Sequence, residues 1–213
     1  MKLTWYGHAC FMMESENGVR IAVDPFDASV GYPMRSIEAD AVLMSHGHHD
    51  HCCRDMIAGE PIVIDTLGHN EIDGVRVTGF ASFHDDQQGA LRGKNIVHLI
   101  EMDGVRLLHA GDLGHLLSSE TIREIGPVDV LMIPVGGTYT LTGEEAAKVA
   151  KAIGAKVTIP MHYKEACVQY PITDEQPFFA AMGVQNVPKM AVLEVRAQTV
   201  EKLPSVCQMD WKA

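Results

Sequence analysis

The segment His46-Gly47-His48-His49-Asp50-His51 places four potential metal ligands, His46, His48, Asp50 and His51, within six residues. It follows the apolar run 41–44, which is typical of a buried strand, and catalytic groups commonly lie at the carboxyl ends of strands. His46 and His48 can point the same way while Asp50 and His51 reach an adjacent position, so one loop can serve two neighbouring metal sites. A solvated polar loop is the alternative, but it gives no reason to prefer imidazole so often. We therefore expect a metal site at this strand end.

Three more ligand-type residues follow later apolar runs. His84 follows residues 77–83, Asp112 comes shortly after residues 105–109, and His162 comes shortly after residues 157–160. Any one of them alone is better explained as a turn residue or as a core histidine bonded to the backbone. As a set at strand ends they favour a shared metal site instead.

The hydrophobic pattern predicts a strand-rich α/β chain. A turn signal at residues 16–18 joins two early strands as part of a meander, and Asp103-Gly104 predicts a hairpin. The sequence Thr142-Gly143-Glu144-Glu145 predicts a capped helix start, and residues 118–125 form a further amphipathic segment. We expect one domain over residues 1–213, without a linker or repeat. The expected strands are residues 3–6, 10–14, 19–23, 41–44, 61–64, 75–83, 95–101, 105–109, 128–135, 156–160, 191–195 and 199–202.

Composition excludes several classes of protein. The chain is 46% apolar and 21% charged, which is ordinary for a globular protein and excludes disorder as the main state. Its apolar runs are too short for a membrane span, and a net charge of −11 without a basic cluster argues against a nucleic-acid partner. Five cysteines without a CxxC pair predict no disulfides, and the first residues do not resemble a secretion signal. We expect a cytoplasmic protein without membrane association.

The motifs as a set resemble the metallo-β-lactamase fold superfamily. The resemblance includes the HxHxDH segment at 46–51, His84, His109-Ala110-Gly111-Asp112 and Pro160-Met161-His162, and it spans nearly the whole chain. Three further segments narrow it to a branch of metal-dependent hydrolases that includes ascorbate-6-phosphate lactonases and, more distantly, N-acylphosphatidylethanolamine phospholipases. These segments are Trp5-Tyr6-Gly7-His8-Ala9, Val23-Asp24-Pro25 and Pro134-Val135-Gly136-Gly137. The resemblance implies a four-layer αβ/βα sandwich, with two mixed sheets face to face, helices outside and metals at one edge.

The resemblance also implies the ligand set of two divalent metal ions. It assigns His46, His48 and His84 to the first metal, assigns Asp50, His51 and His162 to the second, and places Asp112 as the bridge between them. Zinc is the first expectation, but the mixed nitrogen and oxygen donors also suit manganese or iron. Two such cations can hold a hydroxide at neutral pH and polarise the electrophile, so the expected reaction is hydrolysis. Asp50 is also the candidate to orient or deprotonate the attacking water.

Other residues are candidates for supporting roles. His8 lies in a glycine-preceded loop and is expected to hold the metal ligands in place, with direct ligation as the alternative. His115 is a candidate proton donor to the leaving group, although a histidine at the start of a surface helix explains it equally well. Arg92 and Lys94, in the polar loop after His84, are expected to bind an anionic substrate, unless that loop is simply solvated. Thr138 and Tyr139 are expected beside the substrate.

These observations favour a hydrolase that uses a metal-bound hydroxide on a small, anionic ester, lactone or phosphoester. A phosphodiesterase or nuclease of the same fold is the first alternative, but it needs a basic surface or an added arm. A flavodiiron oxidoreductase would have glutamate in place of His48. A metal-dependent sensor without catalysis is the alternative from another class. The partner expected is a small-molecule substrate, and the oligomeric state is left open.

Overall fold

Two six-stranded mixed sheets form the body of the protein in the computed structural model, which describes residues 1–211. The first sheet has the order β15-β1-β2-β3-β5-β7, and the second has the order β13-β12-β11-β10-β9-β8. The strands of the first sheet are β1 (Lys2–Gly7), β2 (Cys10–Glu14), β3 (Arg20–Val23), β5 (Ala41–Leu43), β7 (Ile62–Ile64) and β15 (Val192–Glu194). Those of the second are β8 (Gly68–Ile72), β9 (Val75–Phe83), β10 (Lys94–Met102), β11 (Val105–His109), β12 (Val130–Pro134) and β13 (Val157–Met161).

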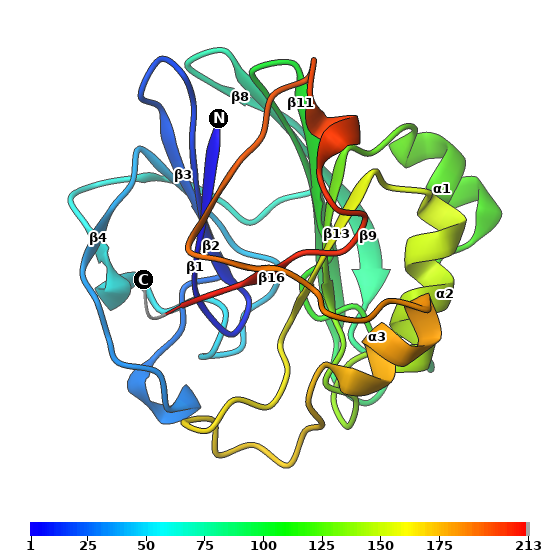
Figure 1. Cartoon of the computed structure of the whole chain (residues 1–213). Helices are drawn as coiled ribbons and strands as arrows, with labels where there is room; N and C mark the ends of the chain where they lie inside the picture. Colours follow the sequence, from blue (N-terminus) through cyan, green and yellow to red (C-terminus); the bar gives the residue numbers. More distant parts are fainter. Residues whose placement is uncertain (212–213) are drawn as a thin grey trace.

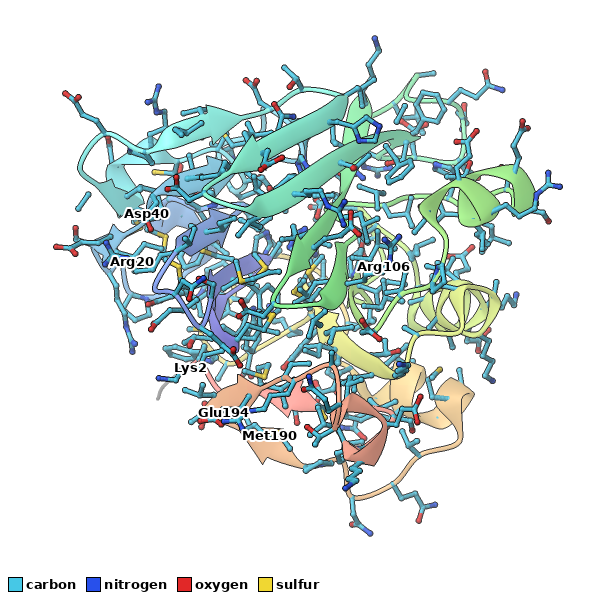
Figure 2. All side chains as sticks on the ribbon, turned by 90° about the horizontal axis from the view of Figure 1, so that it is seen from above. Lys2, Arg20, Asp40, Arg106, Met190 and Glu194 are labelled. Atoms are coloured by element: carbon cyan, nitrogen blue, oxygen red, sulfur yellow. The ribbon has the colours of Figure 1, made fainter. Side chains whose placement is uncertain are left out.

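Each sheet combines antiparallel hairpins with parallel strands. β1, β2 and β3 are antiparallel, and β5 and β7 continue the sheet in parallel. The second sheet repeats this plan, with β8 to β11 antiparallel and β12 and β13 parallel to β11. The late strand β15 returns to pair with β1, and Figure 2 shows its Glu194 beside Lys2, its partner across the two strands.

Alternating side chains of the first sheet divide between two apolar clusters. Phe11 and Met13 face the core between the sheets, whereas the intervening Met12 faces the outer side. There it packs among residues of irregular segments, including Phe26 and Tyr32. The outer cover of the first sheet also includes the 3₁₀ turns η1 (Ala28–Val30) and η2 (Arg54–Met56) and the short parallel pair β4 (Ile37–Glu38) and β6 (Ile57–Ala58).

The α-helices lie on the far side of the second sheet, away from the first (Figure 1). They are α1 (Ser119–Ile125), α2 (Gly143–Ile153) and α3 (Gln176–Met182). At the start of α2 the Thr142 hydroxyl accepts from the Glu145 amide while the Glu145 carboxylate accepts from the Thr142 amide, so the predicted capping box is confirmed. Such a cap stabilises a helix by about 1 kcal/mol. Among the described residues, no helix is both long and apolar enough to cross a bilayer.

The structure corrects one expected strand and adds elements that the pattern did not predict. Residues 199–202 were expected as a strand, but Val200–Lys202 forms the 3₁₀ turn η3, because the amides of Lys202 and Leu203 bond to the carbonyls of Thr199 and Val200. The β-branched residues there suggested a strand, yet only Val200 packs into the core. The unpredicted elements include β8, α3 and the parallel pair β14 (Lys189–Met190) and β16 (Gln208–Met209).

Candidate metal centre

The seven predicted ligands converge at one edge of the sandwich. His46, His48, Asp50 and His51 lie on the loop that follows β5 in the first sheet. The other three come from the second sheet, where His84 follows β9, Asp112 follows β11 and His162 follows β13. Residues more than one hundred positions apart are therefore brought together because the ends of strands from both sheets meet at this edge.

His46, His48 and His84 form a first ligand group. One nitrogen of each ring lies within 4.8 Å of a nitrogen of the other two. Burial lowers the pKa of His46 to about 3, with the nearby His51 adding to the effect. Burial, followed by the charge of His84, also lowers the pKa of His48. Both rings are therefore neutral near pH 7, which is the form that binds a metal.

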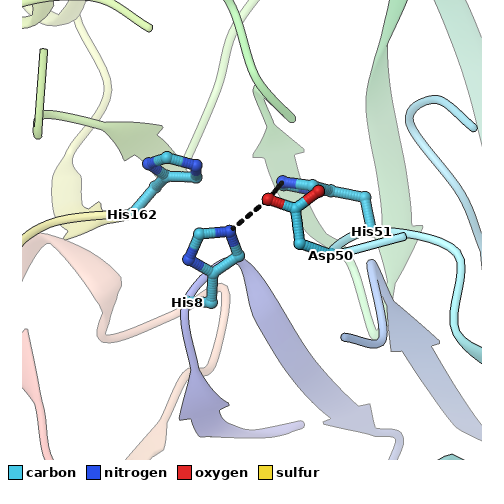
Figure 3. Close-up of side chains that lie close together, drawn as sticks. All are labelled: His8, Asp50, His51 and His162. Carbon is cyan, nitrogen blue, oxygen red and sulfur yellow. Dashed lines mark ion pairs between the residues drawn. The ribbon is translucent and has the colours of Figure 1, made fainter. Parts of the chain in front are cut away.

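His8, Asp50, His51 and His162 form a second ligand group, which Figure 3 shows converging on one point. Their ligand atoms also lie within 4.8 Å of one another. The Asp50 side chain retains 14% exposure, while the three imidazoles are buried. Burial would raise the pKa of Asp50, but contacts with His8 and His51 outweigh it and hold the pKa below the usual range. The carboxylate is therefore ionised at neutral pH.

The Asp112 carboxylate lies between the two groups. Its Oδ2 is 3.0 Å from His84 Nε2 in the first group and 3.4 Å from His162 Nε2 in the second, and its Oδ1 is 3.2 Å from His51 Nε2. Burial would raise the pKa of Asp112, but His162 and His51 outweigh that effect and lower it well below the ordinary value. An ionised carboxylate that faces both groups can ligate a cation on each side.

The donor set fits divalent cations. Several buried polar atoms at this edge have no hydrogen-bond partner within the described residues: His8 Nδ1 and Nε2, His46 Nε2, His51 Nε2, His84 Nδ1, Asp112 Oδ1 and His162 Nδ1. Buried polar groups normally have hydrogen-bond partners. Because many polar atoms in this one cluster have none, the cluster requires an additional partner. The mixed imidazole and carboxylate donors suit zinc, manganese or iron.

A buried network positions these ligands from behind. Asp24, at the end of β3, accepts from His51 Nδ1 at 2.9 Å and from the Ser45 amide and hydroxyl at 2.7 and 2.6 Å. On the other side, Asn95 Oδ1 accepts from the Asp112 amide at 2.9 Å. Gly111 has a positive φ of 56°, and a Cβ there would lie 2.4 Å from Asn95 Oδ1. The glycine before Asp112 is thus required for this close approach.

A cavity of about 340 Å³ opens onto both ligand groups. Arg92, Tyr139 and Tyr170 line it together with residues from both groups. The Arg92 guanidinium lies 5.6 Å from the centre of the Tyr139 ring and donates to the Thr138 carbonyl at 3.1 Å. These contacts orient a half-buried cation beside the metal ligands.

Two of the expected substrate-binding residues lie elsewhere. Lys94 is exposed and lines a separate cavity of about 790 Å³, which lies against His46 and Gly47 and includes Ile96. Thr138 is exposed and its hydroxyl donates to the Pro171 carbonyl at 2.7 Å. Of the four residues expected to contact substrate, the structure thus brings Arg92 and Tyr139 to the metal-facing cavity.

His115 does not face the metal-facing cavity. Its Nε2 accepts from the Phe83 amide at 3.2 Å, and its Nδ1 lies 2.9 Å from the Leu116 carbonyl. Both ring nitrogens thus contact the backbone, and His115 is not among the residues that line the metal-facing cavity. The interpretation of His115 as a structural histidine fits this arrangement, and the proposed acid role does not.

Sequence reasoning gave no role to Asp24, Asp85, Asn95 or Tyr170. The sequence signal for Asp24 was its position directly after an apolar strand, as for His84. Asp85 is 3% exposed and accepts backbone amides at 2.8 to 3.0 Å from Gln87, Gly89, Leu91 and Arg92. It therefore folds the loop that carries Arg92 around one carboxylate.

Comparison with known proteins identifies the class of this fold and site. The family model of the β-lactamase superfamily domain matches residues 2–162. A UPF0173 metal-dependent hydrolase of Methanoregula boonei is 34% identical over 188 residues, which cover 76% of this chain and 82% of the relative. The chain therefore belongs to the metallo-β-lactamase superfamily, in the branch of these hydrolases, as the motifs predicted.

Solved structures confirm the α/β sandwich. A proposed Zn-dependent hydrolase of this superfamily from Thermotoga maritima aligns with a TM-score of 0.80 and 38% identity, covering 98% of this chain and 97% of that one. The metallo hydrolase Igni18 of Ignicoccus hospitalis aligns with a TM-score of 0.65 and 23% identity, covering 85% of this chain and 90% of its own. The similarity to Igni18 supports the fold alone.

Proposed function

We propose that this protein is a hydrolase that binds two divalent metal ions, zinc first with manganese or iron as alternatives, and cleaves a small anionic ester, lactone or phosphoester. The observation that carries the proposal is the position of Asp112 between two separate ligand groups, both open to one cavity. The family and its metal-dependent hydrolase relatives support it.

The residues of the chain have distinct roles in this proposal. His46, His48 and His84 would hold one cation, Asp50, His51 and His162 would hold the other, and Asp112 would ligate both. When bound, the cations supply an activated water nucleophile and polarise the electrophilic oxygen of the substrate. Asp50 is ionised and partly exposed to the cavity, so it can accept a proton from a water there.

Substrate size and charge follow from the metal-facing cavity. Its volume of about 340 Å³ is near the lower end for small-molecule sites. Arg92 is the guanidinium among its lining residues and can form charge-assisted hydrogen bonds to a carboxylate or phosphate. The rings of Tyr139 and Tyr170, 6.1 Å apart, flank the same space. A compact anion with an ester, lactone or phosphoester bond fits these features.

The alternatives fit the molecule less well. A nuclease needs a positively charged track for its polyanion, whereas this chain has a net charge of −11. The ligand set and the cavity that opens onto it favour turnover over a sensor without catalysis. As part of this proposal, we place the protein in the cytoplasm, with a small-molecule substrate as its partner. Its five cysteines form no disulfide, which fits a reducing compartment.

The test is hydrolysis of a panel of lactones, carboxylic esters and phosphoesters by the protein reconstituted with Zn²⁺, Mn²⁺ or Fe²⁺. Each electrophile is presented in an anionic and a neutral form. We expect metal-dependent turnover with a preference for the anionic form. Arg92→Ala should raise KM for it by roughly ten- to a hundredfold, because a charge-assisted contact is lost.

Lys94→Ala is the matched control, since Lys94 lies on the other cavity and its loss should leave KM unchanged. No turnover by the metal-loaded protein on any member of the panel would count against the hydrolase. Equal effects of the two substitutions would count against Arg92 as the anion-binding residue.

A further inference from the structure

His8 lies inside the second ligand group and not behind it. It belongs to the turn between β1 and β2, far in sequence from the other ligands, and its side chain is fully buried. Its Nε2 is 3.3 Å from Asp50 Oδ2, and its ring centre is 4.0 Å from that of His162 and 5.1 Å from that of His51 (Figure 3). His8 thus approaches all three members of this group.

Within the described residues, His8 Nδ1 has no hydrogen-bond partner, and Nε2 lies 3.3 Å from Asp50 Oδ2 without a well-aligned hydrogen bond. A buried histidine with a purely structural role normally donates a ring N–H to a backbone carbonyl or a carboxylate. His98 is an example of a buried histidine anchored in this way, with Nε2 3.2 Å from the Met44 carbonyl. A buried ring that forms no well-aligned hydrogen bond instead points to a partner that the protein itself does not provide.

The backbone holds His8 in an unfavourable conformation. Its φ of 52° is left-handed, and so is the φ of 50° at His162. The His8 carbonyl accepts from the His162 amide at 3.1 Å and from Trp5 Nε1 at 3.0 Å. The preceding Gly7 has a φ of 113°, and a Cβ there would lie 2.5 Å from the Tyr32 ring. Such conformations are costly and cluster at functional sites.

The spacing between His8 and Asp50 matches that between two ligands of one cation. Nitrogen and oxygen ligands at about 2.1 Å from a zinc ion are roughly 3 to 3.5 Å apart, which compares with the 3.3 Å between His8 Nε2 and Asp50 Oδ2. We infer that His8 is a direct ligand of the second metal, together with Asp50, His51 and His162. The inference rests on the proposed function, because it assumes that cations bind at both groups.

This assignment makes the two metal positions unequal. The first group supplies three imidazoles, and the second supplies three imidazoles and a carboxylate before Asp112 is counted. With Asp112 as a ligand of both cations, the first position has four protein ligands and the second has five. The second cation should therefore be retained more tightly than the first.

The first measurement counts coordinated histidines in the wild-type protein without substrate. The two groups contain six histidines, or five if His8 is not a ligand. The six are His8, His46, His48, His51, His84 and His162. Proton NMR of the protein loaded with two equivalents of Co²⁺ resolves the metal-shifted N–H signal of each coordinated imidazole. Six signals are expected, and five would overturn the inference without any substitution.

The second measurement compares His8→Gln with His98→Gln. Glutamine can still donate a hydrogen bond to Asp50 but is a poor ligand for zinc or cobalt. His8→Gln should lose one shifted N–H signal and weaken the tighter of the two Zn²⁺ dissociation constants, measured by competition with a chromophoric chelator, by at least about tenfold. His98→Gln also removes a fully buried imidazole and should change neither result.

Unchanged affinities and signals in His8→Gln would show that His8 only positions Asp50, and the inference would be wrong. These readouts require no turnover, so the two proposals fail separately. A protein that shows six coordinated imidazoles and hydrolyses nothing would contradict the proposed function and leave the role of His8 intact.

Discussion

His51 Nδ1 lies 2.9 Å from Asp24 Oδ2, and both side chains are completely buried. Burial would lower the pKa of His51, but the carboxylates of Asp112 and Asp24 outweigh it and raise the pKa well above the ordinary value. The hydrogen bond to Asp24 directs Nδ1–H backward and leaves Nε2 facing Asp112. A bound cation would take the place of the proton on Nε2.

Replacing Asp24 by asparagine should therefore weaken metal binding at the second ligand group. The amide removes the negative charge that fixes the His51 tautomer, and the expected loss in metal affinity is about ten- to a hundredfold. Chelator competition measures the loss. Asp27→Asn is the matched control, because Asp27 forms a similar pair with His49, 3.1 Å away, on the surface. If both variants kept wild-type affinity, Asp24 would not act through His51.

Removal of metal should lower the melting temperature. Asp50 and Asp112 bring two ionised carboxylates into one largely buried cluster, and cations that bind the folded state stabilise it by mass action. The check is elemental analysis and thermal unfolding before and after dialysis against a chelator, followed by restoration with Zn²⁺. A protein isolated without metal that neither takes it up nor changes its melting temperature would contradict the metal centre.

Asp85→Asn should disorder the loop that carries Arg92 without releasing metal. An asparagine offers one acceptor oxygen, whereas the two Asp85 oxygens together accept four backbone amides. The expected result is a higher KM for an anionic substrate at unchanged metal content. Asp86→Asn, one residue further along, is the control. An Asp85→Asn protein with wild-type KM would show that the loop does not position Arg92.

Asp85 should also make the stability of the folded protein depend on pH in a definite direction. Burial would raise its pKa, but the amides of Arg92, Gly89, Gln87 and Leu91 lower it from 3.8 to about 2. A carboxyl with a depressed folded pKa contributes stability that is complete above its unfolded pKa and is lost as the pH falls through the folded one. Acid unfolding of the metal-free wild type should be steeper than that of Asp85→Asn between about pH 4 and 2.

Much of the fold could be predicted because its strands have a local pattern. β2, β9 and β11 agree with the expected bounds to the residue. The ligand positions also followed from local order, since His84, Asp112 and His162 each come shortly after a strand. The strand prediction for residues 199–202 was wrong because β-branched residues favour strands only when a neighbouring strand is present. Here the chain forms a turn instead.

The remaining features depend on contacts between distant parts of the chain. The contact between His8 and Asp50 depends on how the β1–β2 turn packs against the metal loop, and no sequence spacing encodes it. The same applies to Lys94, which lies close to Arg92 in sequence but lines another cavity, because β10 begins there. For His115, the deciding contact is the hydrogen bond that its Nε2 accepts from the Phe83 amide, a residue 32 positions earlier. Tertiary packing decides such cases.

Asp112→Ala should be the most damaging substitution among the metal ligands. One oxygen of its carboxylate is 3.0 Å from His84 Nε2, and the other is 3.2 Å from His51 Nε2, so it contacts both ligand groups. His162 belongs to the second group alone. Loss of Asp112 should therefore reduce bound metal at both positions, whereas loss of His162 should weaken mainly the second.

The two variants are compared under the same metal supply by metal content per chain and by kcat on a substrate found active. Asp112→Asn separates charge from shape, since it keeps the volume and one acceptor oxygen but removes the negative charge that two cations would share. If the carboxylate bridges the metals, Asp112→Asn should resemble Asp112→Ala, because a neutral amide cannot offset the repulsion between two cations. An Asp112→Ala protein that holds two metals and turns over at a near-normal rate would assign the bridge to another group.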